Sequence, residues 1–146
     1  MADIIIAADH SDEIIRNLDL RVQAGLEACG IQAVSHAQSI IDSKIPRHAG
    51  SWYVSKGAAG LRGSISHKVR GDVCYVGTNN SHAIYNEYGT GIYADGGGGR
   101  KSPWSYKDEK GNWHRTRGIS AIHFLKNALQ DYKEEYKAIL KKYING

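Results

Sequence analysis

Apolar side chains recur at steps of three or four residues through the first third of the chain. The positions are Ile14, Leu18, Val22, Leu26, Cys29, Ala33, Ala37 and Ile40. This spacing places them on one stripe of an amphipathic helix that ends before Pro46. Ser11 can cap the first turn, and Asp12 and Glu13 suit the positive end of the helix dipole. The pattern therefore predicts a long N-terminal helix.

The length of this helix and its glycines bear on its shape. Without a break it would be roughly 50 Å long at 1.5 Å per residue, which exceeds the core of so small a domain. Part of the apolar stripe is therefore expected to lie against another subunit. Gly25 and Gly30 each weaken a helix by about 1 kcal/mol relative to alanine, so a bend is expected near Cys29 and Gly30. Ahead of the helix, the apolar run from Ile4 to Ala8 predicts a short strand.

An alternating pattern lies in the middle of the chain. Its apolar face consists of Leu61, Ile65, His67 and Val69, with polar or charged residues between them. A period of two is typical of a half-exposed strand, predicted here from Leu61 to Arg70. The adhesion-like tripeptide Arg70-Gly71-Asp72 is interpreted as a hairpin turn, after which Val73 to Gly77 returns as the partner strand. In the preceding loop, residues 46–60, Trp52 and Tyr53 are expected to anchor over the core.

A second helical pattern closes the chain, beginning near Phe124. Its apolar side carries Leu125, Leu129, Tyr132, Tyr136, Ile139 and Tyr143. We interpret it as a core-facing helix whose tyrosine hydroxyls lie at the solvent-exposed edge of its apolar side. The predicted fold is α+β: a long N-terminal helix and a C-terminal helix packed on a small, mainly antiparallel sheet, with an inserted β-hairpin arm. Residues 1–146 form one domain, since a chain of this length fits a single core.

The inserted arm is predicted at residues 95–117. Four glycines, Gly96 to Gly99, favour a flexible linker over a phosphate-binding loop, because Pro103 follows where a helix would have to begin. Two short strands with cross-strand Trp and Tyr packing come next. The candidate contact residues of the arm are Trp104, Tyr106, Trp113 and Arg115. They could stack on single-stranded nucleic acid or grip a protein neighbour.

The charge of the chain is unevenly placed. The net charge is +4, yet the first 45 residues hold seven acids against three bases. From Pro46 to Gly118 there are eleven Lys or Arg against five acids. Such asymmetry indicates either contact with nucleic acid or an acidic protein surface, or simply a solvated basic face. The bases are scattered along this stretch rather than clustered.

The sequence offers no evident catalytic or metal-binding group. Seven histidines are present, but none is spaced with another His or a carboxylate as in a metal-binding helix. Cys29 and Cys74 lie in apolar surroundings and are predicted to be reduced, buried thiols. No run of 18 or more apolar residues occurs, so no membrane span is expected. We therefore expect no enzyme, no cofactor and no metal.

Residues 82–93, HAIYNEYGTGIY, form the most distinctive stretch. The spacing of Ile84, Tyr85 and Tyr88 predicts one short turn of helix, and two glycines then allow a sharp reversal. Glu87 is either a solvated acid or a paired one that orients the turn, because an unpaired buried carboxylate is costly. We interpret the stretch as a structural corner and subunit contact. Its residues are Tyr85, Glu87, Tyr88, Gly89, Thr90 and Gly91.

Three segments of the chain carry a family resemblance. They are Gly60 to Ile65, Asn79 to Gly91 and His123 to Leu129. In this order they resemble the "G-x-L-R-x-S-I", "YA…V-E-[FY]-G-T" and "P-F-L-x-P-A-L" signatures of the head–tail joining or tail-completion (neck) proteins of long-tailed bacteriophages and prophages. His123 and Asn127 stand where that family often has prolines.

The resemblance implies a structural virion protein. Its subunits would form a ring, such as a hexamer, that joins or completes the tail at the head–tail interface and lines the DNA passage. The implied partners are further copies of the chain, the neighbouring connector or stopper, the tail-terminator or tail-tube proteins, and DNA passing through without sequence specificity. The implied location is the virion neck, and the host cytoplasm during assembly. The alternative is a basic nucleic-acid-binding module that uses the aromatic hairpin at residues 104–115.

Overall fold

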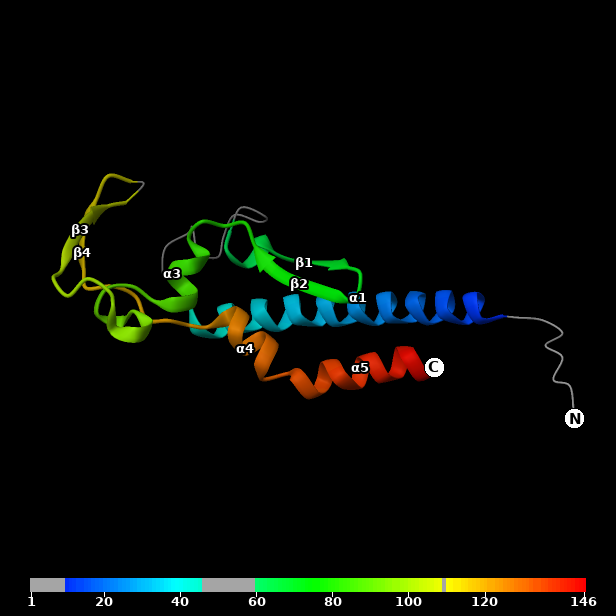
Figure 1. Ribbon diagram of the computed structural model, residues 1–146. Helices are drawn as coiled ribbons and strands as arrows, with labels where there is room; N and C mark the ends of the chain where they lie inside the picture. Colours follow the sequence, from blue (N-terminus) through cyan, green and yellow to red (C-terminus); the bar gives the residue numbers. More distant parts are fainter. Residues whose placement is uncertain (1–9, 46–59, 109) are drawn as a thin grey trace, which may run out of the picture.

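A computed structural model of the protein describes residues 10–45, 60–108 and 110–146. The fold is α+β, as predicted, with a long N-terminal helix, two antiparallel sheets of two strands each and helices at the C-terminus (Figure 1). The helices are α1 (Ser11–Lys44), α3 (Ala83–Tyr88), α4 (Phe124–Gln130) and α5 (Lys133–Asn145). The strands are β1 (Ile65–Arg70), β2 (Val73–Thr78), β3 (Trp104–Lys107) and β4 (Trp113–Thr116), and the 3₁₀ turns are η2 (Arg62–Ser64), η3 (Gly91–Tyr93) and η4 (Asp95–Gly97).

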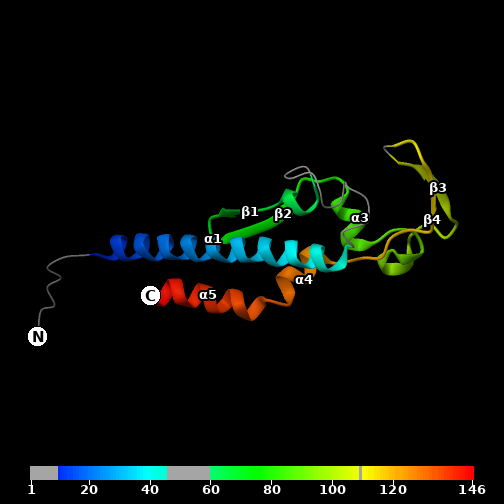
Figure 2. The ribbon, with the colours of Figure 1, turned by 180° about the vertical axis from the view of Figure 1, so that it is seen from behind.

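Helix α1 is the centre of the molecule. The β1–β2 sheet lies along one side of it and α4 and α5 lie along the other, an arrangement that Figures 1 and 2 show from opposite directions. The C-terminal helices therefore pack on α1, with the sheet on its far side.

The bend expected in α1 is absent, because the helix runs uninterrupted for 34 residues. Its glycines serve close packing instead. A Cβ on Gly30 would lie 2.4 Å from the His67 ring and 2.9 Å from Cys74 Sγ, and a Cβ on Gly25 would lie 3.1 Å from Leu140. The helix begins at Ser11 with His10 in the N-cap position, so Ser11 is its first residue rather than its cap.

Strand β1 begins later than the alternation suggested. Residues 62–64 form the turn η2, in which Ser64 donates its backbone N–H to Gly60 O and its hydroxyl to Leu61 O. These local bonds replace strand pairing before Ile65. From Ile65 onward the predicted faces hold: Ile65, His67 and Val69 face inward, while the residues between them are exposed. Gly71 has φ +61° in the predicted hairpin turn, and β2 pairs antiparallel with β1.

The single C-terminal helix predicted from Phe124 is two helices. Between α4 and α5, Tyr132 leaves helical geometry with φ −110° and ψ 18°. At the break its ring stacks on His36 of α1, with ring centres 3.5 Å apart and planes within 7°. The hydroxyl of Tyr136 donates to Ala128 O across the same break. Packing on α1 thus overrides the continuous helical pattern.

One hydrophobic core joins the elements. It consists of Ala37, Ile41, Ile45, Leu61, Ile65, Ala83, Phe124 and Ala128. Cys29 is buried and Cys74 half-buried, both are free thiols, and burial raises the pKa of each. The predicted strand at Ile4 to Ala8 and the expected anchors Trp52 and Tyr53 lie outside the described residues.

Candidate functional site

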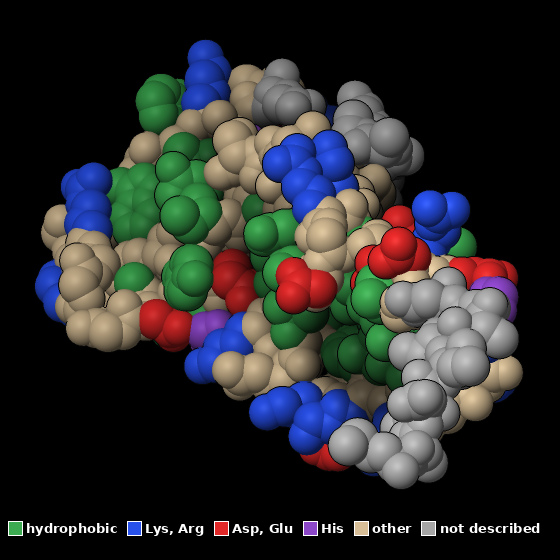
Figure 3. Space-filling model, turned by 45° about the vertical axis from the view of Figure 1, so that its right-hand side comes forward, with side chains coloured by type: hydrophobic (Ala, Val, Ile, Leu, Met, Phe, Trp, Pro, Cys, Tyr) green, Lys and Arg blue, Asp and Glu red, His purple; other side chains and the backbone are tan. Residues whose placement is uncertain are grey.

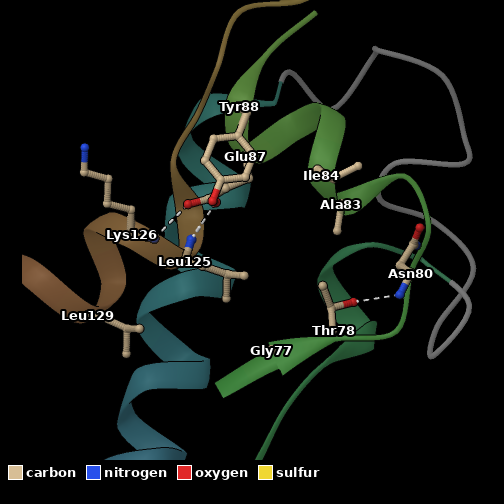
Figure 4. Close-up of a pocket in the computed structure, with 10 residues that line it drawn as sticks. All are labelled: Gly77, Thr78, Asn80, Ala83, Ile84, Glu87, Tyr88, Leu125, Lys126 and Leu129. Atoms are coloured by element: carbon tan, nitrogen blue, oxygen red, sulfur yellow. Dashed lines mark hydrogen bonds between the residues drawn. The ribbon is translucent and has the colours of Figure 1, made fainter. Parts of the chain in front are cut away.

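The centre of the corner is a buried carboxylate. Glu87 lies on the last turn of α3 and is 6% exposed. Its Oε2 and Oε1 accept hydrogen bonds from the backbone N–H groups of Leu125 and Lys126, each at 2.9 Å (Figure 4). These N–H groups belong to the first turn of α4, where helical amides have no partner within the helix. Glu87 therefore caps α4 from a distant part of the sequence.

Backbone hydrogen bonds extend this contact along the corner. Asn86 O accepts from Ile122 N at 2.9 Å, and Thr90 N donates to Ile119 O at 2.9 Å. Ile119 N in turn donates to Thr90 Oγ1 at 3.0 Å. Residues 86–92 are thus joined to residues 117–126 by a ladder of hydrogen bonds. The sequence does not reveal this contact, because the two segments are about thirty residues apart.

Glycines make this ladder possible. Gly89 and Gly91 have φ of +74° and +63°, as the sequence predicts. A Cβ on Gly91 would lie 1.8 Å from Arg117 O, and one on Gly118 would lie 2.0 Å from Thr90 O. No side chain fits at these positions without moving the backbone.

The corner therefore divides into two parts. Glu87, Gly89, Thr90 and Gly91 hold the chain to itself, so the Glu87 carboxylate is already occupied by amides of its own chain. Tyr85 and Tyr88 face solvent and are 52% and 55% exposed. Of the six corner residues, only these two tyrosines present a large side-chain surface to a neighbour.

An apolar groove lies beside the corner, between the end of β2, α3 and α4. It has a volume of about 460 Å³. Ile84, Tyr88 and Leu129 line it and are all exposed, while Glu87 lies at its inner wall and Lys126 at its edge (Figure 4). The sequence pattern did not reveal this groove, because its walls come from three separate segments.

The first ten residues of α1, Ser11 to Leu20, form a projecting stem. All ten are exposed, among them Ile14 at 65%, and Ile15, Leu18 and Leu20. The covering elements reach α1 only from position 21, where Arg21 donates to Ile144 O near the end of α5. Gln23 donates to Gly71 O in the β1–β2 turn. The stem extends beyond both covering layers (Figures 1 and 2).

The arm is a hairpin whose register defines two faces. The pairs are Trp104 with Thr116, Ser105 with Arg115, Tyr106 with His114 and Lys107 with Trp113. Since paired residues share a face, Trp104 and Tyr106 lie on one face and Trp113 on the other. The predicted cross-strand packing of Trp on Tyr is therefore wrong. Tyr106 stacks on His114 instead, with ring centres 5.3 Å apart.

The turn of the hairpin is organised by Asp108. Its carboxylate accepts from the backbone N–H groups of Lys110 and Asn112, at 2.9 and 2.8 Å, and from His114 Nε2 at 2.8 Å. The hydrogen bond from His114 and those from the backbone lower the pKa of Asp108 to about 2. This acid is therefore ionised and occupied within the arm.

The base of the arm is fixed to the corner. His123 is the one described non-glycine residue with positive φ, at +50°, and its Nε2 lies 3.1 Å from Asp95 Oδ2. The glycines interpreted as a flexible linker adopt a defined turn, in which Gly97 N donates to Ala94 O at 3.1 Å. Sequence reasoning missed the role of His123, although its place at the start of a predicted helix marked it.

Charge is concentrated on the arm. Residues 100–117 contain six Lys or Arg against two acids, and the rest of the chain contains 13 of each. This segment therefore has a net charge of +4, and it holds six of the eleven bases between Pro46 and Gly118. In Figure 3 the left-hand side of the molecule, where the arm lies, shows hydrophobic side chains bordered by Lys and Arg.

The part of the chain that the structure describes contains no group of three or more His, Cys, Asp or Glu side chains placed to hold a metal ion. Among the same residues, no helix combines the length and the apolar character needed to cross a membrane. No family model matches the chain, and no curated protein or solved structure gives a match to it.

Proposed function

We propose that the chain is a structural subunit of the neck of a long-tailed bacteriophage or prophage particle, in which its copies form a ring that joins or completes the tail. The observation that carries the proposal is that the described residues of one chain leave two different apolar surfaces exposed. One is the convex stem of α1 and the other is the groove beside the corner.

The stem and the groove of one chain are too far apart to meet. The groove is lined by β2, α3 and α4, and α3 and α4 lie near the opposite end of α1 from the stem (Figures 1 and 2). Ala37 and Ile41 of α1 share the core with residues of these two helices. The rise from Leu20 to Ala37 alone is about 25 Å at 1.5 Å per residue. A contact between the two surfaces therefore joins two copies of the chain.

Such a contact is heterologous, because each copy contributes a different surface to it. Heterologous contacts build a ring when the rotation between subunits closes, and an open filament when it does not. The stem suits this role because Ile14, Ile15 and Leu18 continue the apolar stripe of α1 beyond its cover. If the groove of a second copy bound this stripe, its apolar side chains would become buried.

Charge also favours the pairing. The stem contains Asp12, Glu13 and Asp19 against Arg16, a net charge of −2. At the groove, Lys126 carries a positive charge, and the Glu87 carboxylate is turned to the amides of α4. Complementary charge sets the orientation of such a contact more than its strength.

The segments that resemble neck proteins also meet in space. Leu61 and Ile65 come from the first segment, Ala83 from the second, and Phe124 and Ala128 from the third. All five lie in the one core cluster. Three separate matches that build a single core support a resemblance of the whole domain.

The test is a head–tail joining assay in which purified protein is added to heads and tails from a phage deficient in it. The wild type should restore infectious particles. Leu18→Glu should not, because it places a charge in the apolar stripe that the neighbouring copy would bury. Leu20→Glu makes the same change on the opposite side of α1 and should behave as wild type. Restoration by Leu18→Glu at the wild-type level, or no restoration by the wild type, would contradict the proposal.

A further inference from the structure

We propose that one face of the arm, formed by Ser105, Lys107, Trp113 and Arg115, is a binding site for the phosphate backbone of nucleic acid. The inference rests on the hairpin itself and holds whether or not the chain forms a ring. Residues 100–117 of the arm contain six Lys or Arg against two acids.

The register places the four side chains together. Ser105 pairs with Arg115 and Lys107 pairs with Trp113, and these alternate pairs lie on the same face of the ladder. Lys107 Nζ lies 6.0 Å from the centre of the Trp113 ring. Trp113 is 71% exposed, the highest value among the described large apolar side chains. The Trp113 ring is thus presented to solvent between a Lys and an Arg. The hairpin that carries it projects from the rest of the molecule (Figure 1).

The described acids of the arm, Asp108 and Asp95, are both engaged within the chain. Asp108 is held by the amides of the turn and by His114, which belongs to the other face. Asp95, at the base of the arm, pairs with His123. The remaining described charges of the arm, Arg100, Lys101, Lys110 and Arg117, are all basic and exposed.

This combination fits nucleic acid better than an acidic protein surface. Lys and Arg neutralise phosphates and release condensed counterions, which gives affinity without sequence preference. An exposed tryptophan adds a platform for an unpaired base or for sugar. A two-stranded ribbon is also narrow enough to enter the major groove of a duplex.

The experiment measures binding of the full chain to a labelled 30-base-pair duplex and to a labelled 30-nucleotide oligothymidylate between about 50 and 200 mM salt. The test variant is the double change Lys107→Gln with Arg115→Gln. The control is Lys141→Gln with Lys142→Gln, which removes the same charge from the exposed end of α5. Circular dichroism and thermal melts confirm that both variants are folded.

We expect the arm variant to lose about tenfold or more in affinity at low salt, and its salt dependence on duplex to become less steep by about two in the log–log slope. The control should match the wild type. If Trp113→Ala weakens oligothymidylate binding much more than duplex binding, the ring stacks on unpaired bases, and equal losses place it against the backbone.

Three results would overturn the proposal. The first is that the wild type binds neither probe, and the second is that the arm and control variants lose affinity equally. The third is that polyglutamate competes as well as DNA at equal charge. The last result would assign the face to an acidic protein. A failure of ring formation leaves these measurements unaffected, so the two proposals stand or fall separately.

Discussion

At the scale of single residues, the corner depends on side chains and glycines with specific contacts. Glu87 is a buried acid that satisfies two amides of α4, and Gly91 lies against the backbone of Arg117. Both connect segments that are about 25 to 40 residues apart in the sequence. Their effect should therefore appear in the stability of the whole domain.

Two glycines with similar positive φ angles, Gly91 and Gly96, separate the cost of the backbone angle from the cost of an atomic overlap. Gly91→Ala should destabilise the protein by about 3 kcal/mol or more, because a left-handed angle and a backbone overlap add. Gly96→Ala should cost only about 1 kcal/mol, since Gly96 has φ +73° but no atom within 4 Å of an added Cβ. Urea unfolding of the two variants provides the comparison. Equal losses would show that the approach of Gly91 to Arg117 is not required.

Glu87 gives a second prediction. Glu87→Ala should lower the free energy of unfolding by about 3 kcal/mol, because two helix amides lose a charged acceptor. Glu134→Ala, which removes an exposed carboxylate from the first turn of α5, should change it by less than about 0.5 kcal/mol. A stable Glu87→Ala variant would mean that Glu87 does not support the fold, and its failure in head–tail joining would then make it an interface residue.

At the scale of elements, local patterns and long-range contacts differ in how far the sequence reveals them. The stripe from Ile14 to Ile40 and the alternation from Ile65 to Val69 predicted α1 and β1, because each pattern follows from the geometry of one element. The break at Tyr132 depends on His36 in another helix, and the partner of Glu87 lies almost forty residues away. Such contacts leave no local period, so the groove and the corner ladder could not be predicted.

The arm should respond to acid through its turn. Asp108 has a pKa of about 2 in the folded arm against an ordinary value of 3.8. A carboxylate with a lowered pKa stabilises the fold above its ordinary value and loses that effect as the pH falls through the folded value. The amide signals of Lys110 and Asn112 should stay shifted down to about pH 4 and move to unfolded positions near pH 2. Asp108→Ala should show unfolded positions already at pH 7.

The arm is also expected to move independently of the core. Its two strands pair with each other and, among the described elements, make their main contacts there. Hydrogen exchange should be fast at residues 104–116 and slow in β1 and in the buried half of α1. The hydrogen bond from Ile92 N to Arg117 O should mark the boundary between the mobile arm and the core, so protection from exchange should begin at Ile92. Strong protection of the whole hairpin in a monomer would contradict this expectation.

At the scale of the whole molecule, the chain has a long axis with a different apolar surface toward each end. The stem projects past α5 and past the β1–β2 turn, and the groove lies beside α3 and α4 (Figures 1 and 4). The proposed head-to-tail contact between copies would cover both surfaces at once. Residues 100–117 of the arm, with a net charge of +4, belong to neither of these surfaces.

The central claim is this heterologous contact, and a mixing measurement tests it most directly. Leu18→Glu disables the stem and Leu129→Glu disables the groove, while each variant keeps the other surface intact. Native mass spectrometry should show rings or chains for the wild type, monomers for each variant alone, and a one-to-one dimer when the two variants are mixed. If the mixture stays monomeric, or if either variant still assembles alone, the stem and the groove are not partners.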